Sequence, residues 1–215
     1  DSHGRALWAV GTVLARSKRE GMQGMAVRLF EAALPTVLEF TSPRAWAFSL
    51  LGIQHYLRRF PGDRAVLNVQ ATLIHKLMDL YRSNRTDEWP WFEDSVTYCN
   101  PVLPQTLIRY GQTYDDPEAL SIGLESLAWL VEIQQSDKGW VMPIGNQGFY
   151  YKGGPISYFD QQPVEAYSLL SACLDAYRAT KDAKWYQYAN QSYAWFFGHN
   201  ALGVPVYDKV TGGCR

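Results

Sequence analysis

The chain lacks the features that mark several large classes of protein. No apolar run approaches the roughly 20 residues that a membrane-spanning helix needs. Its 3 cysteines stand at positions 99, 173 and 214, without C-x-x-C spacing. This pattern predicts free thiols in a reducing compartment rather than a disulfide framework or a thiolate metal site. The first residues, Asp1 to Arg5, lack the basic and then apolar order of an export signal, which predicts a cytoplasmic location.

An excess of charge of one sign and the common nucleotide-binding motifs are missing as well. The formal net charge is −1, and the lysines and arginines are scattered, so no nucleic acid or anionic membrane is expected as a partner. There is no G-x-G-x-x-G turn, no P-loop and no G-x-S-x-G elbow. His55, His75 and His199 fall within or at the ends of expected helices, without metal-ligand spacing. No cofactor and no metal are therefore expected.

Aromatic residues, in contrast, are abundant. They make up 14% of the chain, with 8 tryptophans and 14 tyrosines, and many fall between the expected helices. A flat aromatic ring matches the apolar face of a pyranose, so aromatic side chains in loops favour a carbohydrate as ligand.

Helical periodicity and capping residues predict eight helices and no strand. Ser42-Pro43, Asn100-Pro101 and Asp116-Pro117 each place a capping side chain before a proline, which is typical of a helix start. The expected helices are 3–18, 22–40, 43–60, 64–83, 101–114, 117–135, 163–180 and 183–198.

The helices alternate in character. The first, third and seventh are apolar on nearly every side, whereas the fourth, sixth and eighth have one apolar face. We therefore expect the odd helices inside and the even helices outside, as in an all-α protein of the α/α-toroid class. A closed ring of six hairpins needs twelve helices, so we interpret residues 1–215 as a single toroid domain that is incomplete on both sides.

Polar and aromatic clusters precede the expected inner helices and should therefore share one rim of the toroid. Carboxylates beside aromatic rings suit glycoside hydrolysis, in which one acid protonates the leaving oxygen and another carboxylate attacks or activates water. The catalytic candidates are Glu93, Asp94, Asp160 and Glu165. The candidates for binding the sugar are His3, Arg5, Trp89, Trp91, Tyr98, Asn100, Tyr158, Gln161 and Gln162.

Structural roles compete for some of these residues. Asp160 could cap the helix that follows it, and Asp94 could accept backbone hydrogen bonds within its own loop. His3 and Arg5 lie at the start of a buried helix, where Arg5 could need a carboxylate partner. Glu93 has no cap or helical salt bridge to explain it, so we expect Glu93→Gln to abolish turnover without unfolding the protein.

Four segments resemble one known family. They are similar to the α/α-toroid region that follows family-4-type glycosyltransferase domains in bacteria, within the six-hairpin glycosidase-like folds. The segments are DSHGRALWAVG (1–11), WPWFEDSVTYCNPVLPQTLI (89–108), FDQQPVEAYSLLSACLDAYRAT (159–180) and WFFGHNALGVPVYDKVTGGC (195–214). The resemblance implies further helices on both sides of this chain and a role with carbohydrate. Cys99 departs from the family pattern, which often has Asp before Asn100.

These observations leave several functions open. The first is an enzyme that acts on the glycosidic bonds of an oligosaccharide or polysaccharide, as a hydrolase or a phosphorylase. The second is a glycan-binding domain that serves a linked glycosyltransferase. A sugar isomerase or epimerase would use histidines as acid and base, but His3 is the one histidine expected in a rim loop. A purely structural helical scaffold would leave the loop aromatics unexplained.

Overall fold

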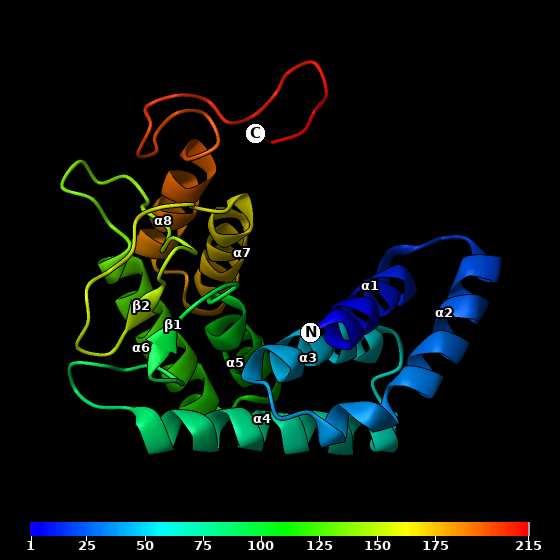
Figure 1. The fold of residues 1–215 in the computed structure, drawn as a ribbon. Coiled ribbons are helices and arrows are strands. Elements are labelled where there is room, and N and C mark those ends of the chain that lie inside the picture. Colours follow the sequence, from blue (N-terminus) through cyan, green and yellow to red (C-terminus); the bar gives the residue numbers. More distant parts are fainter. Residues whose placement is uncertain (215) are drawn as a thin grey trace. The chain divides into compact units, whose positions relative to one another are not determined.

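The computed structural model describes residues 1–214, which form a helical chain with little strand (Figure 1). Within that range there are eight α-helices, one 3₁₀ helix and two strands of two residues each. The α-helices are α1 (Ser2–Arg16), α2 (Glu20–Ala33), α3 (Pro43–Arg59), α4 (Arg64–Asn84), α5 (Val102–Tyr114), α6 (Pro117–Ile133), α7 (Pro163–Thr180) and α8 (Ala183–Ala194). The 3₁₀ helix is Pro35–Glu39, and the strands are β1 (Ser95–Val96) and β2 (Tyr150–Tyr151).

All eight predicted α-helices are present, and the third to the seventh agree with prediction to within two residues at each end. The second was expected to reach residue 40 but ends at Ala33, because Pro35 cannot continue an α-helix and opens the 3₁₀ helix instead. The eighth ends at Ala194, four residues earlier than expected. The expectation of no strand was wrong, because β1 and β2 form a short antiparallel pair.

The chain divides within α4 into two compact units, Asp1–Leu80 and Tyr81–Arg215, which are described separately. In the first unit α1 packs against α3 and α2. The helices α1 and α3 meet at glycines: a β-carbon on Gly11 would lie 2.3 Å from the carbonyl oxygen of Gly52, and one on Gly52 would lie 2.5 Å from that of Leu7. Their backbones are therefore in direct contact.

Burial on every side, predicted for the first, third and seventh helices, is observed in α3, whereas α1 and α7 each bury one face only. Every residue of α3 from Arg44 to Leu57 is buried. In α1 the buried residues form a single stripe, Gly4, Leu7, Gly11 and Leu14. Ala6 and Ala9 are exposed. The alanines made α1 look apolar on every side, but an alanine is small enough to lie in solvent at little cost.

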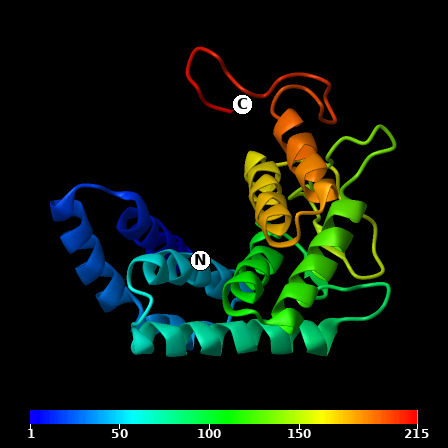
Figure 2. The same cartoon turned by 180° about the vertical axis from the view of Figure 1, so that it is seen from behind.

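In the second unit α5 packs against α6 and α7, and α7 against α8, as the two opposite views also show (Figures 1 and 2). The residues of α5 from Val102 to Ile108 are all buried. The core of this unit joins α5, α6, α7 and α8 through Ile108, Leu127, Leu169 and Trp185, in that order. As predicted, α6 and α8 bury one face only.

Hydrogen bonds attach the last turn of α4 to α6. The Tyr81 hydroxyl donates to a Glu125 carboxylate oxygen at 2.8 Å, and Arg85 pairs with the other oxygen at 3.1 Å. Burial, together with the Glu125 carboxylate, raises the pKa of Tyr81 well above its usual value. The first residues of the loop 84–100 are therefore held against α6.

Candidate functional site

Two loops that are far apart in sequence meet at a short β-ribbon in the second unit. Ser95 pairs with Tyr151 and Val96 with Tyr150, and the Lys152 amide donates to the Asp94 carbonyl at 2.8 Å. The loops 84–100 and 136–162 therefore lie at the same end of the helices (Figure 1). This confirms that the two clusters predicted there share one rim.

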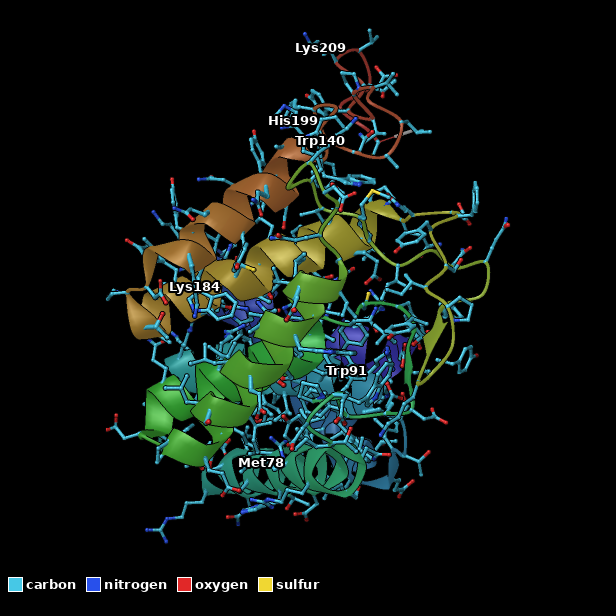
Figure 3. All side chains as sticks on the ribbon, turned by 90° about the vertical axis from the view of Figure 1, so that its left-hand side faces the viewer. Met78, Trp91, Trp140, Lys184, His199 and Lys209 are labelled. Carbon is cyan, nitrogen blue, oxygen red and sulfur yellow. The ribbon has the colours of Figure 1, made fainter. Side chains whose placement is uncertain are left out.

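The two tryptophans of the first loop are buried, at 3% exposure for Trp89 and 0% for Trp91. Their indole N–H groups donate to the carbonyl oxygens of Glu93 at 2.7 Å and Ser95 at 3.1 Å. Both rings pack against Trp129. Trp89 and Trp91 were expected to bind the sugar, but they are buried and form the core beneath the ribbon (Trp91 is labelled in Figure 3).

Glu93 and Asp94 precede β1 directly. Glu93 is half-buried, and its backbone is held by the hydrogen bond from Trp89. Asp94 is exposed, and it contributes its carbonyl oxygen to the ribbon. Two acidic residues of different solvent exposure therefore follow each other in the sequence directly before β1.

Glu165, in contrast, is only 3% exposed. One of its oxygens accepts the backbone N–H of Cys99, and the other lies 3.4 Å from the backbone nitrogen and 3.2 Å from Nδ2 of Asn100. Asn100 is fully buried and accepts the Thr97 amide at 2.9 Å. Glu165 was predicted to be a catalytic residue and Asn100 to bind the sugar. Both lie in the protein interior, where they hold the turn before α5.

Asp160 is exposed and has a left-handed backbone, with φ of 58°. Its carbonyl accepts the Asn146 amide at 3.2 Å. The N-cap of α7 is Gln162, which has no side-chain cap bond, so the alternative in which Asp160 caps α7 was wrong. Beside Asp160, Tyr158 is 50% exposed and Phe159 78%.

A third loop, residues 195–214, joins this end of the unit. The Trp195 indole donates to Gln161 at 3.4 Å, and the Gln161 amide in turn lies 3.3 Å from the Tyr158 carbonyl oxygen. His199 stacks on Trp140 with ring centroids 5.8 Å apart (Figure 3). The structure thus links the 195–214 loop to the 136–162 loop.

Sequence reasoning did not place Trp140 and His199 at this end of the unit. Because α8 was predicted to reach residue 198, His199 was placed at a helix end rather than in a loop. A segment that follows an outer helix lies on the same rim as one that precedes an inner helix. That rule, applied to the aromatic residues of 195–207, could have identified the third loop.

The hairpin 147–157 encloses a shallow depression of about 320 Å³, lined in part by Phe149, Tyr151 and Ile156. Tyr151 is 55% exposed, and Tyr98, at the far end of the ribbon's first strand, is 37% exposed. These rings, unlike Trp89 and Trp91, are open to a ligand.

The two candidates of the first unit have structural contacts. His3 Nε2 lies 2.7 Å from the Ala33 carbonyl oxygen, and its ring meets Phe40 edge-on. The Arg5 guanidinium lies 4.1 Å from the centre of the Phe48 ring, a cation–π contact. Both residues thus help to order the first unit.

Within residues 1–214, no group of three or more His, Cys, Asp or Glu side chains is arranged to hold a metal ion. Over the same range, no helix is both long and apolar enough to cross a bilayer. The three cysteines are free thiols, as predicted. Burial raises the pKa of the Cys173 thiol, so this group stays protonated and unreactive.

Comparison with solved structures gives matches along most of the chain. An unsaturated glucuronyl hydrolase specific for heparin superposes with a TM-score of 0.70 at 15% identity, covering 96% of this chain and 58% of the hydrolase. The GH76A α-1,6-mannanase of Salegentibacter sp. HEL1_6 gives 0.70 at 14% identity, covering 91% and 60%. A glycoside hydrolase family 76 mannosidase of Bacteroides thetaiotaomicron gives 0.64 at 10% identity, covering 99% and 63%.

The fold is that of an α/α toroid. This confirms the predicted fold class. The chain spans about three-fifths of the length of these structures, so the likeness concerns the fold and not the whole protein. No protein-family model matches the sequence, and a search among curated proteins gives no match.

Proposed function

We propose that the ribbon end of the second unit binds a glycan and acts on its glycosidic bonds. One observation carries this proposal: the β1–β2 ribbon fixes Glu93 and Asp94 beside the loop that bears Asp160 and the exposed rings of Tyr151 and Tyr158. Carboxylates next to open aromatic rings are what glycoside chemistry requires.

The two acidic residues before β1 differ in solvent exposure. Glycosidases combine a protonated acid with an ionised carboxylate, and the acid is the one in the less polar setting. Glu93 is half-buried and is proposed as the proton donor. Asp94 and Asp160 are exposed and are the candidates for the ionised partner.

The exposed polar and aromatic residues of the loops would bind the sugar. Tyr98, Tyr158 and Gln161 come from the two loops and have exposed or half-buried side chains. Gln162 is half-buried at the start of α7. Trp89 and Trp91 would contribute by supporting the ribbon from below, through their hydrogen bonds to Glu93 and Ser95.

A second candidate function is a glycan-binding domain that serves a linked glycosyltransferase. It is favoured by Phe159, which is 78% exposed next to Tyr158, because an open pair of rings can hold a glycan without any catalytic group. Binding without turnover would distinguish this function from the first.

The test compares Glu93→Gln with the wild type on a panel of manno-, gluco- and galacto-oligosaccharides. Loss of the proton donor should lower kcat by about 10²–10⁴-fold while the melting temperature stays the same. Glu88→Gln is the matched control, since Glu88 is an exposed glutamate of the same loop. This variant should turn over glycan at the rate of the wild type. A Glu93→Gln variant that is destabilised but fully active would show that Glu93 is structural. If the wild type binds a glycan without turning it over, the binding-domain function is correct.

A further inference from the structure

Glu165 connects two helices at the ends where they begin. It is the third residue of α7, where a glutamate commonly reaches back to the cap of its own helix. Here its carboxylate instead accepts backbone N–H groups from the turn that leads into α5. Pro101, the N-cap of α5, gives no side-chain cap bond. Glu165 therefore places a carboxylate at the N-terminal end of α5 from a neighbouring helix, where a negative charge is favoured.

The turn that Glu165 holds has a costly backbone. Cys99 has φ of 45°, a conformation that costs a residue other than glycine about 1–2 kcal/mol. The hydrogen bond from its amide to Glu165 helps to offset this cost. Without that acceptor, we expect the turn to relax toward a more common backbone conformation.

From this turn the contacts lead directly to the ribbon. Asn100 donates from Nδ2 to Glu165 and accepts the Thr97 amide on Oδ1 at 2.9 Å. Thr97 follows β1, and Glu93 and Asp94 precede it. A movement of the 97–100 turn would therefore move the strand and the two carboxylates with it.

We infer that Glu165 is a positioning residue that sets the location of Glu93 and Asp94 through Asn100, Thr97 and β1. This inference rests on the proposed function, in which Glu93 donates a proton. Glu165 is buried beneath the turn, with 3% of its surface exposed. Its role is to keep the proton donor within reach of the glycosidic oxygen.

The test is Glu165→Gln in the full-length protein. The new amide places N–H donors where the turn also offers donors, so one of the three hydrogen bonds is replaced by a repulsive contact. A proton donor displaced by about 1 Å loses on the order of 10²-fold in rate. We expect kcat to fall by that order while KM stays nearly constant, because the interaction that is lost occurs in the transition state. Hydrogen exchange should accelerate in residues 93–100 and 149–152.

The matched control is Asp175→Asn, which also weakens a contact between α5 and α7. Asp175 accepts the Gln105 amide at 2.8 Å, away from the ribbon, and pairs with Arg178. This variant should have a lower melting temperature than the wild type, with the same kcat and the same hydrogen exchange in the ribbon. It separates positioning from a general loss of helix packing.

Asn100→Ala provides a second route if Glu165→Gln does not fold. It removes the link to Thr97 while leaving the Glu165 carboxylate with its backbone donors, and it should give the same fall in kcat. When both variants fold, the kcat of the double variant should be no lower than that of the slower single variant, because the two residues act in one chain of contacts.

The outcomes separate the two proposals. A wild type that turns over glycan, together with a Glu165→Gln variant of unchanged kcat and unchanged ribbon exchange, would overturn the positioning role and leave the proposed function standing. A wild type that neither binds nor cleaves any glycan would overturn the proposed function and with it the catalytic part of the inference. Hydrogen exchange in residues 93–100 and 149–152 would then show only whether Glu165 holds the ribbon in place.

Discussion

The α-carbon of Gly145 lies against the backbone of Phe159, so closely that a β-carbon on Gly145 would come within 1.8 Å of the Phe159 carbonyl oxygen. The neighbouring residues are hydrogen-bonded in the same way: the Gly145 amide donates to Ser157 at 2.8 Å and that of Asn146 to Asp160 at 3.2 Å. The two sides of the 145–160 loop are thus joined backbone to backbone. This contact fixes Asp160, whose side chain is proposed to face the glycan.

Gly145→Ala should therefore destabilise the protein and displace Asp160. Forcing a methyl group into a closed contact costs about 1–3 kcal/mol. We expect a lower urea midpoint and a lower kcat. Gly24→Ala is the control, because nothing lies within 4 Å of the β-carbon that it adds in α2. Alanine in a helix is favoured over glycine by roughly 0.5–1 kcal/mol, so this control should be stabilised. A Gly145→Ala variant as stable as the wild type would show that the loop opens easily.

Trp89→Phe should release the backbone of Glu93. Phenylalanine can still pack against Trp129 and Tyr150, but it cannot donate to the Glu93 carbonyl. The loss should cost about 1 kcal/mol, because the part-buried Glu93 carbonyl oxygen loses the indole N–H as its donor. The kcat on the true glycan should fall as well. Trp185→Phe, in the helical core of the same unit, should lower stability and spare kcat. Equal kcat values for the two variants would contradict the proposed role of Trp89.

Asp116→Ala should weaken the start of α6. The Asp116 carboxylate accepts the amides of Glu118 at 3.1 Å and Ala119 at 3.0 Å. Removal of such a cap costs about 1 kcal/mol. Asp116→Asn keeps an acceptor oxygen and should lose only a small part of that stability. Thermal unfolding of the wild type and the two variants measures these losses of stability. An Asp116→Ala variant with an unchanged melting temperature would contradict the capping role of Asp116.

The stability of the first unit should fall as the pH rises from about 10 to 12. Burial and a hydrogen bond to Asp63 raise the pKa of Tyr56 from 10.0 to about 12. Between these values the unfolded chain loses the Tyr56 proton while the folded chain keeps it, so unfolding is favoured as the pH increases. Tyr56→Phe keeps the stack on Phe30 and should show a smaller decline over this range in urea titrations. Parallel curves for the two proteins would rule out this origin of the pH dependence.

Much of the fold could be predicted because its signals are local. Asp116 before Pro117 indicated the start of α6, and the structure shows the expected cap. Asn100 before Pro101 also indicated a helix start, but the Asn100 side chain turns to Thr97 and Glu165 instead of capping α5. That choice depends on a residue 65 positions away, which no local pattern reveals.

The candidate site was harder to predict because sequence composition does not say which way a side chain points. Trp89 and Trp91 lie in a loop rich in carboxylates, like many sugar-stacking residues. Both are nevertheless buried beneath a ribbon that pairs Ser95 with Tyr151, two residues far apart in the sequence. Pairing over such a distance is set by tertiary packing. Glu93 and Asp94 could be proposed from the sequence because their clustering with aromatic residues is local, and their role stays a prediction.

The glycine contact between α1 and α3 fixes the register of the two helices. Gly11 faces Gly52, and Gly52 in turn touches the backbone of Leu7. A slide of α1 by one turn, about 5.4 Å, would bring a residue with a side chain opposite Gly52, where there is no room for one. The two helices can therefore separate, but they cannot shift along each other while packed. Neither glycine can be exchanged for a larger residue with a compensating change in the other, since the partner is already the smallest residue available. Position 11 and position 52 should consequently tolerate no substitution, singly or together, in a library selected for folded protein.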